Sequence, residues 1–159
     1  MKYTIVAIAF VFAALTQTFG QQAGDQTKTQ QQKVTDEELK KYAVTMDSIN
    51  DMKTSLSEEI SEILKADGKM TVERYTELSK IAEDSTQLAA ANATPEEIAL
   101  LKAIADKKNE GIAEINNTYQ ALARDYVGAA SFNKVKKALS TDPALKAKYE
   151  AMLEELGKG

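Results

Sequence analysis

Two long runs of apolar residues, spaced alternately three and four positions apart, constrain the fold of this 159-residue chain more than any other feature. This spacing places side chains on one face of an α-helix, so each run predicts a long amphipathic helix. No segment has the alternation typical of a strand, and we therefore expect an all-α protein. The first run contains Leu39, Tyr42, Met46, Ile49, Leu56, Ile60 and Ile63; the second contains Ile98, Leu101, Ala105, Lys108, Ile112, Ile115, Tyr119, Leu122 and Tyr126.

Both long helices carry start and stop signals. Residues 35–38 (Thr-Asp-Glu-Glu) fit the capping box, in which a hydroxyl and a Glu three residues later satisfy the first amides of a helix. Residues 94–97 (Thr-Pro-Glu-Glu) repeat this signal with Pro at the first helical position, where its missing amide costs nothing. Gly68 and Gly128 then supply the stops.

Three shorter helices are expected between and after the long ones. One begins near Thr71 and continues past Leu88, a second is marked by Phe132, Val135 and Leu139, and residues 140–143 (Ser-Thr-Asp-Pro) separate it from a third. The apolar residues of the first are Val72, Tyr75, Leu78, Ile81 and Leu88, and those of the last are Leu145, Tyr149, Met152, Leu153 and Leu156.

The chain also resembles itself at a spacing of about 59 residues, with 35–39 matching 94–98 and the two apolar runs in phase. Two long-short helical hairpins joined by short connections predict an antiparallel four-helix-bundle-like arrangement, with the last segment as a short extra C-terminal helix. The sustained three-four spacing favours a shallow, coiled-coil-like crossing. We expect a monomer; a dimer of elongated hairpins is the alternative.

The N-terminal segment predicts export. Lys2 precedes an uncharged run of about a dozen residues, which is typical of a signal peptide and short for a membrane-spanning helix of roughly 20 residues. We expect a signal peptide over 1–20, a disordered Gln-rich leader over 21–34 and one helical domain over 35–157. The absence of cysteine leaves no thiol for a lipid anchor, so a periplasmic or secreted protein without stable membrane insertion is expected.

The composition limits the catalytic, metal-binding and nucleic-acid-binding functions that the chain could have. The chain has no His and no Cys, which excludes His-based catalysis, cysteine nucleophiles and ordinary zinc sites. The net charge of −4 argues against nucleic acid as a partner. Acidic residues that are adjacent in the sequence point in different directions around a helix and are usually exposed to water, so such pairs do not predict a catalytic site. We therefore expect no catalytic, cofactor-binding or metal-binding residues and no cofactor.

Three stretches resemble a known family: residues 35–43, from the capping box to Ala43; residues 128–135, Gly-Ala-Ala-Ser-Phe-Asn-Lys-Val; and residues 142–145, Asp-Pro-Ala-Leu. They are similar to the family called domain of unknown function 4168, which occurs in exported bacterial proteins. The resemblance implies a secreted helical domain. It brings no activity, cofactor or binding residue to this chain.

These observations favour a non-enzymatic envelope or secreted interaction module with an envelope or extracellular protein partner. The alternative is a small-ligand carrier or enzyme that uses a cavity in the bundle. A pocket that gathers several buried polar groups would favour the alternative, whereas a filled apolar core would favour the interaction module. Two lysines stand out: Lys53 interrupts the first apolar run, and Lys108 belongs to the second. They either extend their ammonium groups to water or form a functional polar layer.

Two further groups of side chains could contact a ligand. Tyrosines lie on the apolar faces, where such rings usually pack in the core. Lys134, Lys136 and Lys137 form a small basic cluster that could touch anionic lipid or glycan, although a solvated face is the simpler interpretation.

Overall fold

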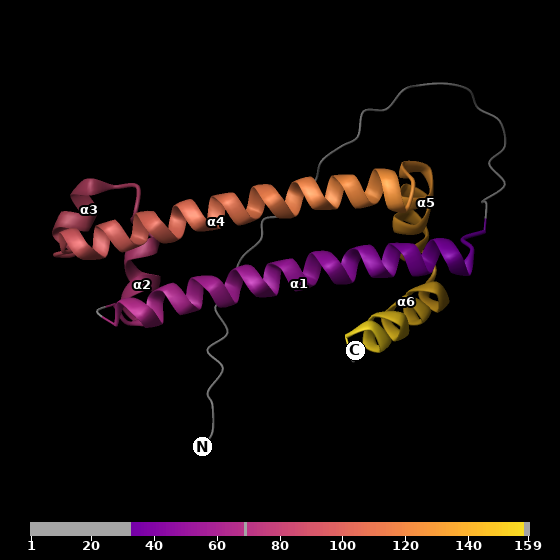
Figure 1. Cartoon of the computed structure of the whole chain (residues 1–159), viewed down its shortest axis with the longest axis horizontal. Helices are drawn as coiled ribbons and strands as arrows, with labels where there is room; N and C mark the ends of the chain where they lie inside the picture. The colour runs from indigo at the N-terminus through magenta and orange to yellow at the C-terminus, as the bar shows by residue number, and fades with distance from the viewer. Residues whose placement is uncertain (1–32, 69, 158–159) are drawn as a thin grey trace, which may run out of the picture. The chain divides into compact units, whose positions relative to one another are not determined.

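The computed structural model describes residues 33–68 and 70–157 (Figure 1). The predicted signal peptide over 1–20 and residues 21–32 of the predicted leader lie outside these described residues. From Val34 onward the chain forms one compact unit. Val34, the last residue of the predicted leader, packs against the apolar cluster at the start of the first helix, so the ordered domain begins earlier than predicted.

The described part of the chain is helical and contains no strand, which confirms the all-α class. Its elements, in chain order, are α1 (Asp36–Asp67), α2 (Val72–Ser79), α3 (Ser85–Ala90), α4 (Pro95–Ala121), a π-helical turn η1 (Leu122–Tyr126), α5 (Ala129–Leu139) and α6 (Pro143–Leu156).

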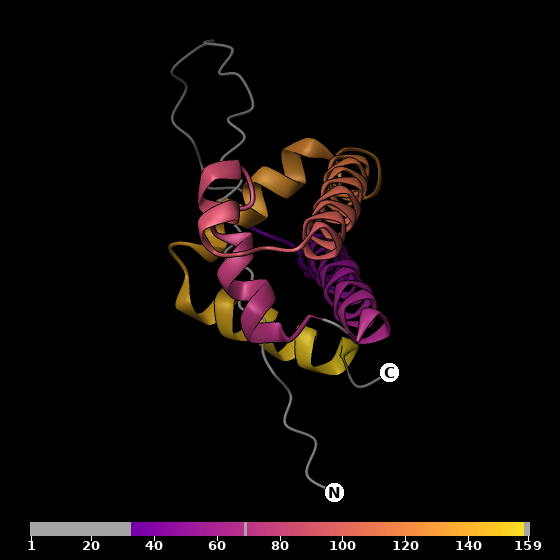
Figure 2. The same cartoon turned by 90° about the vertical axis from the view of Figure 1, so that its left-hand side faces the viewer.

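The two long helices form the axis of the unit. α1 and α4 lie side by side and run in opposite directions, with α2 and α3 at the end where α1 stops and α4 starts (Figures 1 and 2). At the other end, α5 and α6 pack against α1 and against each other. The expected helical bundle is therefore confirmed, although its short helices cover the two ends of the long pair.

Both capping boxes form as the sequence predicts. The Glu38 amide donates to the Thr35 hydroxyl oxygen over 3.2 Å, and the Thr35 amide donates to the Glu38 carboxylate over 3.0 Å. Thr94 and Glu97 repeat the pair at 3.2 and 2.9 Å. These contacts satisfy amides that have no partner inside the helix, which is why the helix starts could be placed from sequence.

The end of the unit that contains α5 and α6 has an aromatic core. The ring centroids of Tyr42 and Phe132 lie 4.8 Å apart, and those of Tyr119 and Phe132 lie 5.5 Å apart with their planes nearly perpendicular. Tyr149 reaches this cluster from α6, 5.7 Å from Tyr42. Burial raises the pKa of Tyr42 to about 12. Most of the tyrosines that the sequence places on apolar faces thus pack in the core.

The residues that are buried in α4 and in the segment after it differ in part from those that the apolar run predicts. Ile98 and Tyr126 were expected to be buried but are 42% and 44% exposed, while Ile104, Ala123 and Val127 are buried instead. The π turn explains the later shift, because the Val127 amide donates to the Leu122 carbonyl five residues back, which adds a residue to the turn. In α1, Leu64 is buried beside the predicted Ile60.

The prediction of one continuous helix from Thr71 past Leu88 is wrong. It is divided into α2 and α3 by a turn over 80–84. Asp84 caps α3 with its carboxylate, which accepts from the Thr86 and Gln87 amides at 2.9 and 3.0 Å. An Asp that caps a new helix competes with continuation of the old one.

The two capping glutamates make comparable contacts with the short helices. Glu38 of α1 accepts from Lys134 of α5 at 2.6 Å, and Glu97 of α4 accepts from Arg74 of α2 at 2.9 Å. At the start of each long helix, the glutamate of the capping box thus forms an ion pair with a short helix. The internal repeat stays a prediction, and these paired contacts agree with it.

Candidate binding pocket

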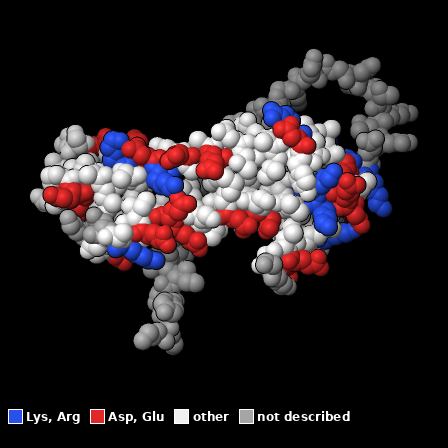
Figure 3. All heavy atoms as spheres, in the orientation of Figure 1, with Lys and Arg blue, Asp and Glu red and all other residues white. Residues whose placement is uncertain are grey.

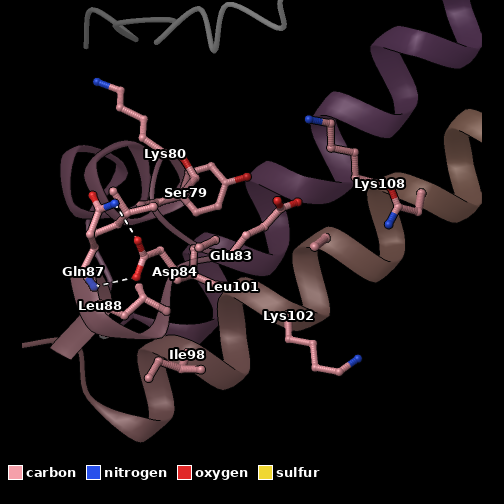
Figure 4. Close-up of a pocket in the computed structure, with 15 residues that line it drawn as sticks. Ser79, Lys80, Glu83, Asp84, Gln87, Leu88, Ile98, Leu101, Lys102 and Lys108 are labelled. Carbon is pink, nitrogen blue, oxygen red and sulfur yellow. Dashed lines mark hydrogen bonds between the residues drawn. The ribbon is translucent and has the colours of Figure 1, made fainter.

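The described residues form a pocket of about 670 Å³ between the α2–α3 segment and the first half of α4, which we call the α3–α4 pocket. One wall is α4 from Ile98 to Asn109; the other contains Tyr75 and Ser79 of α2, the turn over 80–84, and Gln87 and Leu88 of α3. Figure 4 shows these two walls facing each other. The break between α2 and α3 therefore shapes the pocket.

Arg74 fastens the α3 wall to α4. Its guanidinium donates to Glu97 at 2.9 and 3.2 Å, to Glu77 at 3.1 Å and to the Ala91 carbonyl at 3.0 Å. The guanidinium, followed by the Thr94 amide, lowers the pKa of Glu97. One side chain thus links α2, the end of α3 and the start of α4, so the position of the wall depends on Arg74.

The turn after α3 is also conformationally constrained. Asn92 has a φ of 52°, in the left-handed region, where Asn is among the better tolerated residues. The Ala93 amide donates to the Leu88 carbonyl across this turn over 3.0 Å. α3 is therefore fixed at its start by Asp84 and at its end by this turn and Arg74.

The pocket has an apolar floor and a polar rim. Leu88 and Leu101 are buried, and Tyr75 and Ile81 are half-buried. Most of the polar residues that line it are exposed: Ser79, Lys80, Glu83, Asp84, Gln87, Lys102 and Asn109. The arrangement suits contact with a partly apolar molecule, because polar rims around apolar floors are typical of binding sites.

The sequence directs attention to Lys108 and Lys53, and the two lysines differ in their relation to the α3–α4 pocket. Lys108 is half-buried and lines the α3–α4 pocket. Lys53 is also half-buried, on α1, and does not line this pocket. The two lysines therefore do not share this site, and the choice between solvated ammonium groups and a functional polar layer stays a prediction.

The predicted basic cluster on α5 is divided by an ion pair. Lys134 binds Glu38, and the Ser131 hydroxyl donates to the same carboxylate over 2.7 Å, while Lys136 and Lys137 are exposed. On the face shown in Figure 3, acidic and basic side chains are mixed. The cluster thus serves at least partly to hold α5 on α1.

Sequence reasoning missed most of this pocket. Leu101 is buried, as the apolar run predicts, but Ile98 is exposed and Lys108 is half-buried, and all three residues line the wall that faces the break between α2 and α3. The available signal was Asp84-Ser85-Thr86-Gln87, an Asp followed by helix-compatible residues, which is a start signal for a new helix.

None of the described helices is long and apolar enough to cross a membrane. Within the same residues, no group of three or more Asp or Glu side chains is arranged to hold a metal ion. Comparisons of the chain with family models, with curated proteins and with solved structures found no match.

Proposed function

We propose that this protein is a non-enzymatic, exported interaction module that binds an envelope or extracellular protein partner through the α3–α4 pocket. The observation that supports this proposal is the lining of the pocket, in which the buried members are apolar and most of the polar members are exposed at the rim. An enzyme site typically needs polar groups held in fixed, partly desolvated positions, whereas a contact surface needs an apolar centre and a polar rim.

Export, the signal peptide over 1–20 and membership of the family called domain of unknown function 4168 are parts of this proposal that rest on the sequence. The alternative is a small-ligand carrier with the same pocket. The volume of about 670 Å³ supports it, because small-molecule sites span about 300–1,000 Å³.

The test is affinity capture from the native envelope and culture fractions with three forms of the mature protein. The wild-type protein should retain a protein partner, and Ala105→Phe should lose it, because Ala105 is exposed on the pocket wall and a phenyl ring there would fill the pocket. Ala147→Phe places the same ring on an exposed site of α6 and should behave as wild type. Equal retention by all three forms would contradict the proposed surface.

A further inference from the structure

The apolar floor of the α3–α4 pocket is covered in the structure. Leu88 of α3 and Leu101 of α4 line the pocket, but each of these residues is only 6% exposed. Leu78 of α2 is completely buried. A partner that binds through an apolar centre gains stability in proportion to the apolar area that it removes from water, and these three residues offer it little area. Strong binding at the floor therefore requires the α2–α3 segment, residues 71–91, to move away from α4.

An ion pair holds the α2–α3 segment against the start of α4. The Nε and Nη2 atoms of Arg74 lie 2.9 and 3.2 Å from the two carboxylate oxygens of Glu97. The two side chains are 26% and 15% exposed, so water screens the pair only in part, and bidentate pairs of this kind are among the stronger polar contacts in proteins. Two other contacts of Arg74, with Glu77 and with the Ala91 carbonyl, stay within the segment. Loss of the Glu97 contact would therefore release the segment from α4 and leave α2 joined to α3.

The two ends of the segment are suited to act as hinges. Gly68, which follows α1, has a φ of 63°, and Asn92, which follows the segment, has a φ of 52°. Hinges are typically a few positions at the ends of helices or in loops. Each helix of the segment also has its own cap, because Thr71 accepts from an amide of α2 at 3.1 Å and Asp84 accepts from an amide of α3 at 2.9 Å. The segment can therefore move as a unit with both helices intact.

We propose that the α2–α3 segment is a hinged cover over the apolar floor of the α3–α4 pocket, and that the ion pair between Arg74 and Glu97 is the latch that keeps the cover closed. The structure shows the closed form, in which Leu88 and Leu101 are buried. In the open form both side chains are available to a partner. The inference rests on the proposed function for the use of the pocket, and it adds how access to the pocket is controlled.

The first test measures the position of the cover. Because the chain has no cysteine, two spin labels can be attached to the mature protein through Thr86→Cys on α3 and Ala113→Cys on α4, both at exposed positions. Double electron-electron resonance then gives the distribution of distances between the labels. Arg74→Met removes the latch and should raise the population of a second, longer distance by about tenfold, because hydrogen bonds between charged groups are lost. Glu97→Gln should have a smaller effect in the same direction, since Gln can replace Glu in the capping box but lacks the charge.

The second test measures whether opening exposes the apolar floor. Nile red, an uncharged dye that fluoresces more strongly on apolar surfaces, should be at least about threefold brighter with Arg74→Met than with the wild-type protein at the same concentration. Arg124→Met is the matched control, because Arg124 forms a comparable ion pair with Asp125 at 2.7 Å and does not line the pocket. It should change neither the distances nor the dye fluorescence. Far-ultraviolet and near-ultraviolet dichroism establish that each variant keeps its helices and its tyrosine packing; Glu97→Gln replaces Arg74→Met if that variant does not.

Three results would overturn the inference: wild-type distances in the folded Arg74→Met protein, an equal change in the Arg124→Met control, or a longer distance without brighter dye. Its failure can be told apart from failure of the proposed function. If the cover stays closed in Arg74→Met but capture of a protein still depends on Ala105, the latch is wrong and the interaction module stands. If the cover opens and capture is unaffected by Ala105→Phe, the reverse holds.

Discussion

The contact between Gly111 of α4 and Leu56 of α1 offers a quantitative test of how the two long helices pack. A Cβ atom added at position 111 would lie 2.5 Å from Leu56 Cδ1 and 2.8 Å from its Cδ2. Leu56 is buried, so it has little room to move aside. We infer that position 111 is a glycine because α1 and α4 approach each other too closely there to leave room for a side chain.

Two effects of Gly111→Ala oppose each other. Alanine stabilises a helix interior by about 1 kcal/mol relative to glycine, while an extra methyl forced into a packed core costs about 1–3 kcal/mol. We expect a net loss of about 1 kcal/mol in the wild-type background. In a Leu56→Ala background both Cδ atoms are gone, so the same substitution should stabilise by about 1 kcal/mol. The coupling free energy is the difference, about 2 kcal/mol.

The assay is urea unfolding of the four proteins of this double-mutant cycle, followed by far-ultraviolet dichroism. Leu64→Ala is the matched control, since Leu64 is a buried leucine two turns further along α1 and should show no coupling to position 111. If Gly111→Ala stabilises the protein equally in the wild-type and Leu56→Ala backgrounds, the close approach of α1 to α4 at this layer is wrong.

Three further substitutions test other parts of the structure. Thr45→Val should stabilise the protein by about 1 kcal/mol in urea unfolding, because the Thr45 hydroxyl is fully buried and has no hydrogen-bond partner among the residues that the structure describes; a loss of stability would reveal a partner for the hydroxyl. The Lys134 ammonium and then the Thr35 amide hold the pKa of Glu38 at about 2, below its ordinary 4.5. This contribution is present above pH 4.5 and is lost as the pH falls toward 2, so Glu38→Gln should flatten the fall of Tm in that range, and parallel Tm curves would count against the ion pair. Lys53→Met should change the unfolding free energy by less than about 1 kcal/mol, because Met keeps the half-buried stem; a loss above about 2 kcal/mol would place the ammonium in a paired, buried setting.

The parts of the fold that could be predicted are those set by local interactions. Capping boxes, stop glycines and apolar spacing act within a few residues, so the starts of α1 and α4 and the all-α class follow from the sequence. The aromatic cluster around Tyr42 and Phe132 also lies on the predicted faces.

What could not be predicted depends on contacts between distant residues. The π turn rotates the apolar face from the predicted Tyr126 to Val127, and nothing in the spacing of the run marks that extra residue. Arg74 holds the end of α3 against α4 through Glu97, 23 positions away, so the pocket wall is determined by a tertiary contact. The sequence therefore does not predict the α3–α4 pocket, even though it directs attention to one of the lining residues, Lys108.

The central claim is that the α3–α4 pocket is the surface through which this protein binds. Site-specific photocrosslinking tests it most directly, with benzoylphenylalanine placed at Ala105 on the pocket wall or at Ala147 on α6, both exposed positions, in protein expressed in its native cells. We predict a discrete crosslinked adduct from position 105 and none from position 147. An adduct from position 147 with none from position 105 would contradict the claim.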